Sequence, residues 1–128
     1  MKETNISLVV KGEITEDDFQ DLSFLSKFGK ISFRRKGERI SRVVPPLDMN
    51  VFTFTFDLCE KSDVLDFLSI MNGLSLDKLK MNNDVKLRLY LQSNSAQIYL
   101  MFSKSVIQDI ANLNIDMEIS VLSWGECE

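Results

Sequence analysis

Histidine, a frequent general base and metal ligand, does not occur in this chain of 128 residues. Serine and cysteine nucleophiles therefore lack the imidazole that usually activates them. The two cysteines, Cys59 and Cys127, lie too far apart in sequence for a compact zinc motif, and we expect two reduced thiols. The sequence thus predicts no catalytic residue, no metal and no cofactor, and a protein that is not an enzyme.

Composition also limits the partners. The chain has 15 basic and 19 acidic residues, a net charge of −4, which argues against a nucleic-acid partner. Its five glycines are scattered and form no phosphate-binding loop. No apolar run is long enough to span a bilayer, and the first residues lack the apolar core of a secretory signal. We expect a cytoplasmic protein without membrane contact.

An acidic cluster lies near the N-terminus, at the predicted start of a helix. Its members are Glu13, Glu16, Asp17, Asp18 and Asp21. Thr15 and Asp18 have the spacing of a capping box, and acidic residues in a first turn stabilise the helix dipole. The cluster has two interpretations: a solvated helix start, or a surface for a cationic partner. Carboxylates at an exposed helix start do not favour acid–base catalysis.

A basic segment follows and has two interpretations. Lys30, Arg34, Arg35, Lys36, Arg39 and Arg42 lie close together in sequence, interrupted by Glu38. Lys36-Gly37-Glu38 predicts a hairpin turn, with the chain returning over residues 39–44. Arg34, Arg35, Lys36 and Arg39 could then bind an anion, or the charges could protect a sheet edge from aggregation. No aromatic residue alternates with them, which argues against RNA binding.

The strongest indication of a binding surface is a predicted hairpin over residues 85–103. Val85, Leu87, Leu89 and Leu91 alternate with polar residues, and the same alternation continues over 96–102 after a turn at 93–95. The outer face then carries Lys86, Arg88, Tyr90, Gln92, Gln97, Tyr99 and Met101. Tyrosine, arginine and methionine are enriched in interfaces. Asp116 and Glu118 of the last strand would lie beside Lys86 and Arg88 if the strands are neighbours.

The elements that position these residues form a single domain over residues 1–128, with the order β-α-β-β-β-α-β-β-α-β. Strands are predicted at 5–11, 31–33, 39–44, 52–56, 85–92, 96–102 and 115–121, with Trp124 and Gly125 in a tail. Helices are predicted from Thr15 to Gly29, from Ser62 to Gly73, and from Ser103 or Ser105 to residues 112–114, with one extra turn near Leu76 and Leu79. The fold class is α+β: a mostly antiparallel sheet with short helices packed on one face.

Two stretches of the sequence resemble a bacterial family known as domain of unknown function 4279. The resemblance lies in the strand VKLRLYLQ, the segment AQIYLMFS, and the helix KSVIQDIANLNID that leads into MEISVL. The opening stretch ISLVVKGEITEDDFQDL resembles that family's first strand and acidic helix. In overall character the chain is similar to small bacterial immunity proteins, which are acidic domains that bind and block a co-expressed toxin.

These observations predict an immunity or antitoxin-type inhibitor that neutralises a cognate protein toxin, which would be basic and could be a nuclease. The predicted partner-binding residues are Glu16, Asp17, Asp18, Asp21, Arg88, Tyr90, Tyr99, Asp116 and Glu118. The alternative is a small-ligand or nucleotide-sensing module that uses the basic segment 34–42. A hydrolase is the least favoured interpretation. The sequence leaves the oligomeric state open.

Overall fold

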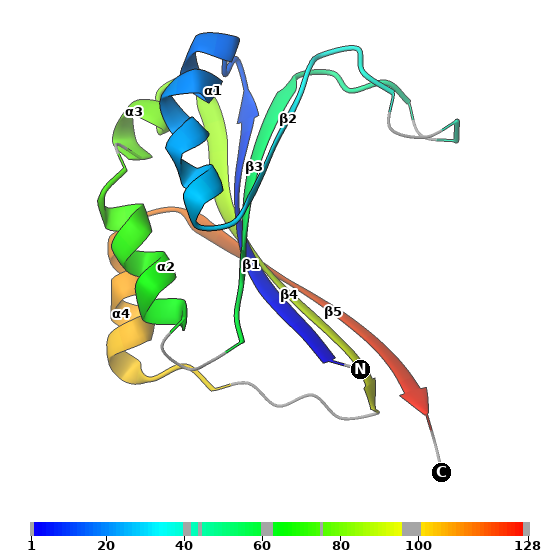
Figure 1. The fold of residues 1–128 in the computed structure, drawn as a ribbon, viewed down its shortest axis with the longest axis vertical. Helices are drawn as coiled ribbons and strands as arrows, with labels where there is room; N and C mark the ends of the chain where they lie inside the picture. Colours follow the sequence, from blue (N-terminus) through cyan, green and yellow to red (C-terminus); the bar gives the residue numbers. More distant parts are fainter. Residues whose placement is uncertain are drawn as a thin grey trace.

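A single sheet covered by helices on one face forms the protein (Figure 1). The structure, a computed structural model, describes residues 2–39, 42–43, 45–59, 63–74, 76–95 and 101–126. The strands are β1 (Lys2–Gly12), β2 (Lys30–Arg34), β3 (Asn50–Asp57), β4 (Asn83–Ser95) and β5 (Asp116–Glu126). The helices are α1 (Glu16–Leu22), the 3-10 helix η1 (Ser23–Lys27), α2 (Asp63–Asn72), α3 (Leu76–Lys80) and α4 (Lys104–Asn112). The predicted α+β class is confirmed.

The strands lie in the order β2-β3-β1-β4-β5. The first three neighbouring pairs are antiparallel, and only β4 and β5 are parallel. Parallel neighbours need a crossover, which α4 supplies. The extra turn predicted near Leu76 is α3, and Ser103 is confirmed as the N-cap of α4. Ser62, the predicted cap of α2, lies outside the described residues.

The predicted hairpin over 85–103 is wrong in the described residues. Ser93, Asn94 and Ser95 continue β4 instead of turning, and Met101 and Phe102 belong to no strand. Residues 96–100 lie outside the described part of the chain. The reason is that β1 and β5 already occupy the two edges of β4, so a returning strand has no free edge to pair with. Alternation identifies a strand's two faces but not its partner.

The return strand predicted at 39–44 is also wrong. Arg39, Arg42 and Val43 lie outside any strand, and β2 pairs with β3 instead. The amide of Gly37 donates to the carbonyl of Leu47 (2.7 Å), and the amide of Leu47 donates to the carbonyl of Glu38 (2.9 Å). These bonds close the base of a projecting arm, which we define as residues 35–49. The strand that pairs with β2 is β3, which follows this arm in the sequence.

The two faces of the sheet differ as alternation predicts. The face beneath the helices carries fully buried side chains from three central strands, namely Ile6, Leu8, Val10, Phe52, Phe54, Leu87 and Leu89. The opposite face, which we call the open face, has no helix over it in Figure 1.

The last strand is longer than predicted, because Trp124 and Gly125 belong to β5 and not to a tail.

The capping box predicted at the start of α1 is confirmed. The Thr15 hydroxyl accepts from the amide of Asp18 (3.2 Å), and an Asp18 carboxylate oxygen accepts from the amide of Thr15 (3.0 Å). The helix is shorter than predicted: α1 ends at Leu22 and continues as η1. Gly29 follows the helical region, but its φ does not lie in the left-handed range of a C′ glycine.

We expect Thr15→Ala to lower the free energy of unfolding by about 1 kcal/mol, because the amide of Asp18 loses the hydroxyl that accepts its hydrogen bond. Urea denaturation followed by circular dichroism measures this change. Ser69→Ala, which removes an exposed hydroxyl from α2, is the control and should change stability by less than about 0.5 kcal/mol. A Thr15→Ala effect no larger than that of the control would contradict a stabilising role for the cap.

Candidate functional site: an acidic groove

A hollow of about 490 Å³ lies between α1 and the segment that joins α2 to β4. The carboxylates of Glu13, Asp18 and Asp21 line it from the α1 side. We call this hollow the acidic groove. Its complete lining is Glu13, Asp18, Asp21, Leu22, Phe24, Gly73, Leu74, Lys78, Leu79, Met81, Asn82 and Asn83. The structure thus brings part of the predicted acidic cluster together with residues about sixty positions later in the chain.

The floor of the acidic groove is apolar and its rim carries exposed apolar side chains. Leu22 is buried, and Leu74 and Leu79 pack against the core. Phe24 is 43% exposed and Met81 is 79% exposed. Aromatic and methionine side chains are enriched in protein interfaces, whereas carboxylates are depleted from them.

Asn83 shapes one end of the groove. Its side-chain Nδ2 donates to the carbonyl of Leu79 (2.9 Å), which ties the start of β4 to α3. A Cβ on Gly12 would lie 2.8 Å from Asn83 Oδ1, so only glycine fits there without displacing this contact. Within the described residues, Asn83 Oδ1 is buried and lacks a hydrogen-bond donor. The groove therefore has a rigid end built from two strands and α3.

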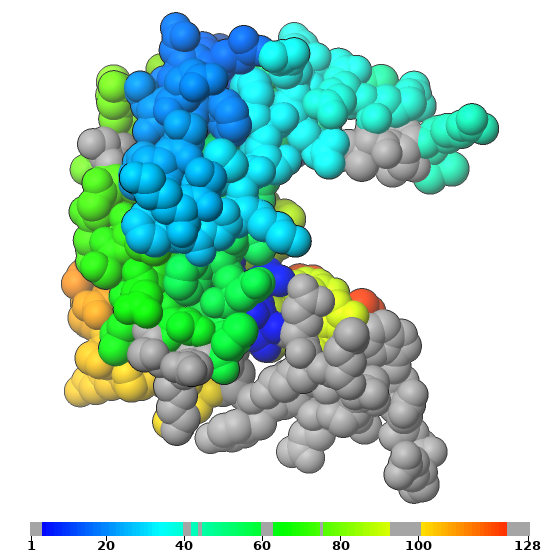
Figure 2. Space-filling model, viewed as in Figure 1, coloured from blue at the N-terminus to red at the C-terminus, as the bar shows by residue number. Residues whose placement is uncertain are grey.

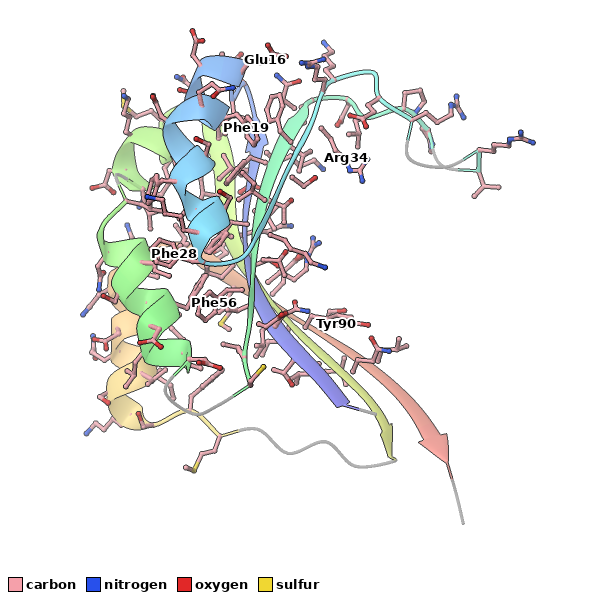
Figure 3. All side chains as sticks on the ribbon, in the orientation of Figure 1. Glu16, Phe19, Phe28, Arg34, Phe56 and Tyr90 are labelled. Carbon is pink, nitrogen blue, oxygen red and sulfur yellow. The ribbon has the colours of Figure 1, made fainter. Side chains whose placement is uncertain are left out.

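The remaining residues of the acidic cluster point elsewhere. Glu16 forms an ion pair with Arg35 at the base of the arm, and Figure 3 shows Glu16 at the arm end of α1. The stacked rings of Phe19 and Phe33, 5.4 Å apart, lie beside this pair in a second hollow of about 400 Å³. Asp17 is exposed and does not line the acidic groove. The cluster is thus divided between two hollows.

The structure lacks the predicted return strand in the described residues of 39–44 and pairs two arginines of the predicted anion site with carboxylates. Arg34 pairs with Glu38 (3.2 Å), and Arg35 pairs with Glu16. The amide of Lys36 donates to Asn50 Oδ1 (2.6 Å), which fixes the turn, and Arg39 donates to the carbonyl of Arg42 (3.4 Å). Two of the four residues therefore direct their charge to carboxylates, and no hairpin gathers the four on one face.

The open face carries the second predicted group of partner-binding residues. Arg88 and Tyr90 lie on β4 opposite Glu118 and Ser120 of β5. One Glu118 carboxylate accepts from Lys86 Nζ (3.2 Å) and Arg88 (3.3 Å), so the predicted neighbourhood of acidic and basic residues is confirmed. Asp116 lies opposite Lys86 in the register. Tyr99 and Gln97 lie outside the described residues.

Tyr90 projects from the face away from the helices (Figure 3), and its hydroxyl donates to Gln92 Oε1 (2.6 Å). Figure 2 shows the molecule hollowed on this side, beneath the arm. The acidic groove lies on the helical side of the sheet. The predicted partner-binding residues therefore form two surfaces separated by the sheet and cannot contact one small epitope together.

The sequence predicted none of the lining residues of the acidic groove other than its carboxylates. Phe24, Lys78, Met81 and Asn83 were not recognised as site residues. The simplest interpretation of the nine phenylalanines is that they belong to the core, and for Phe24, which is 43% exposed, this is wrong. One signal was available: Phe24 lies outside the helical stripe of Phe19, Leu22 and Leu25. The pairing of α1 with α3 depends on tertiary structure, and no local pattern predicts it.

Glu118 gives a pH-dependent prediction. The hydrogen bond from Lys86, opposed by partial desolvation and reinforced by Arg88, lowers the pKa of the Glu118 carboxyl. A lowered pKa in the folded state stabilises the protein above the unfolded pKa and loses this effect as the pH falls through the folded value. We expect Glu118→Gln to destabilise slightly at pH 7 and progressively less as the pH is lowered toward 3, as measured by urea denaturation. An equal change in stability at pH 7 and pH 3 would show that the ionised Glu118 carboxylate is not the cause of the change.

Comparisons with known proteins give no match: no family model, no curated protein and no solved structure resembles the chain significantly. The resemblance to the domain of unknown function 4279 family stays a prediction.

No described helix is long and apolar enough to cross a membrane. Among the described residues, no three side chains of the metal-binding types cluster in a way that could hold an ion. Fold and groove together define a small α+β domain with a surface hollow lined on one side by carboxylates.

Proposed function

We propose that the chain is a non-enzymatic binding protein that holds a basic protein partner in the acidic groove, as an immunity or antitoxin-type inhibitor does. One observation carries the proposal: Glu13, Asp18 and Asp21 line one side of an apolar floor with Phe24 at its rim. One Asp18 oxygen also accepts from Thr15 in the capping box. Such a groove matches lysine and arginine side chains, because their aliphatic stems pack on apolar surface while their charged ends reach carboxylates.

Charge supports a toxin as the partner. Nucleases that bind phosphates carry basic surfaces, and a net charge of −4 on the inhibitor accelerates its encounter with such a surface. Only one lysine, Lys78, lines the described part of the groove. Cys59 is a free, exposed thiol, which is typical of a reducing compartment and supports action in the cytoplasm.

The test combines capture and reconstitution. The tagged chain is used to capture proteins from the lysate of its source cells, and the captured protein is purified and titrated against the chain by calorimetry. We expect a basic protein that binds in equimolar amount and whose toxicity in a growth assay is suppressed by co-expression. Binding should weaken at least about tenfold when the salt concentration rises from low to high ionic strength.

Charge reversal locates the interface. Glu13→Lys combined with Asp21→Lys should weaken binding by about 100-fold or more, because two attractive contacts become repulsive. Both residues are exposed, so the fold should persist. Asp66→Lys combined with Asp109→Lys, at exposed positions of α2 and α4 that do not line the groove, is the matched control, because it changes the net charge by the same amount. An equal loss in both proteins would assign the effect to net charge, and unchanged binding in the groove variant would refute this site.

A further inference from the structure

The outer edge of β5 is an exposed template for strand pairing. Among the described strands, β5 pairs only with β4, so the backbone groups along its other side face outward. Its side chains near the middle are apolar and exposed: Ile119 by 63%, Val121 by 57% and Leu122 by 45%. A long edge strand with exposed apolar residues readily pairs with another strand.

The opposite edge of the sheet is protected against strand pairing, so of the two edges of the described sheet only β5 is open to another strand. The strand there, β2, has only five residues, and Lys30 and Arg34 on it are exposed. Short length and basic side chains both discourage edge pairing. By contrast, β5 has eleven residues and contains no lysine, arginine or proline. Its single irregularity lies between Ser123 and Glu126, which leaves residues 116–122 regular.

We propose that β5 pairs antiparallel with β5 of a second copy, so that two sheets join edge to edge across a two-fold axis. With the axis at Ser120, Ile119 lies opposite Val121 of the second copy and Glu118 lies opposite its Leu122. Residues of equal parity share a face, so this register keeps Ile119 and Val121 of both copies on one side of the joined sheet and Leu122 of both copies on the other. No two acidic residues among 116–122 then face each other.

A second copy fits this edge better than a basic partner does. The acidic side chain nearest the centre, Glu118, already accepts from Lys86 and Arg88, so it offers little charge to an incoming cation. The exposed side chains Ile119, Val121 and Leu122 are apolar, and the same strand of a second copy offers the same side chains in antiparallel pairing. The edge also shares no residue with the acidic groove. The dimer therefore leaves the groove free, and this inference does not depend on the proposed function.

Sedimentation equilibrium from micromolar to sub-millimolar concentration tests the proposal. We expect the wild-type chain to form dimers, and Val121→Lys to raise the dimer dissociation constant at least about tenfold, because a lysine at an edge opposes pairing. The matched control is Leu65→Lys on α2, where the leucine is 51% exposed; it should dimerise like the wild type. A wild-type chain that remains monomeric throughout overturns the proposal, and so does an equal effect of the two substitutions.

A disulfide tests the strand register and does not depend on the folding of the lysine variant. In a background of Cys59→Ser and Cys127→Ser, Ser120→Cys places two thiols directly opposite each other across the two-fold axis. Opposite residues of antiparallel strands have Cα atoms about 4.5–5.5 Å apart, within the range that a disulfide spans. We expect mild oxidation to give a covalent dimer. Ser69→Cys, exposed on α2, is the control, and equal crosslinking in both chains overturns the proposed pairing.

Discussion

Gly29→Ala is expected to lower the free energy of unfolding by about 3 kcal/mol or more. A Cβ at Gly29 would overlap the carbonyl oxygen of Thr55 and lie 3.1 Å from a ring carbon of Phe54. The carbonyl belongs to the backbone of β3, next to β2 in the sheet, so relief requires strands to move. Urea denaturation of the wild type and the variant measures the loss.

Two other glycines provide matched controls for this substitution. Gly37 has a φ of +87° but has nothing within 4 Å of an added Cβ, so Gly37→Ala should cost about 1–2 kcal/mol from backbone strain alone. Gly73 would meet the carbonyl of Ile70 at an ordinary 3.4 Å, and Gly73→Ala should change stability by less than about 1 kcal/mol. If Gly29→Ala costs no more than Gly37→Ala, close approach to Thr55 is not what requires glycine at this position.

Gly29 also illustrates what the sequence predicts and what it does not. Its position after a helical stripe correctly marks the end of the helical region. The physical reason is different from the predicted one, since the close neighbour lies on a strand that begins twenty residues later. A C′ glycine and a glycine at a close strand contact look alike in one sequence, because only tertiary structure distinguishes them.

Local patterns were the most reliable part of the prediction. The strands at β1, β3 and β4, the capping box at Thr15 and the inward-facing leucines of β4 all follow from residue types within a few positions. The neighbourhood of Lys86 and Glu118 also follows, because opposite charges on adjacent strands attract. Each of these features depends on the backbone geometry of one element or on the simplest charge complementarity.

Strand partners were the least reliable part. Residues 39–44 were predicted to pair with β2, but β3 takes that place, and the described residues Arg39, Arg42 and Val43 belong to no strand. Nothing in alternation distinguishes a neighbouring partner from one that follows a long connection, because the pattern describes one strand at a time. The acidic groove was unpredictable for the same reason: α1 supplies its carboxylates, and the segment after α2 supplies much of its apolar floor.

The second large effect is expected at the centre of the core, where Phe54→Ala should lower the free energy of unfolding by about 3–5 kcal/mol. The ring of Phe54 is fully buried, and it stacks on Phe67 of α2 with centroids 6.2 Å apart. Phe56 contacts the same two rings at 6.4 and 5.9 Å. Removing Phe54 therefore opens a cavity and loses one of the two ring contacts that join β3 to α2.

Phe28→Ala is the matched control, since it deletes the same atoms where the ring is 49% exposed (Figure 3). We expect it to cost less than about 1.5 kcal/mol, because water already reaches half of that side chain. The urea dependence of unfolding should keep the same slope in both variants, which would assign the difference to the folded state. Similar losses from Phe54→Ala and Phe28→Ala would mean that the ring cluster is not the central connection between sheet and helices.

Because α2 leads into the segment that lines the acidic groove, a Phe54→Ala chain should also bind a basic partner less tightly than a Phe28→Ala chain.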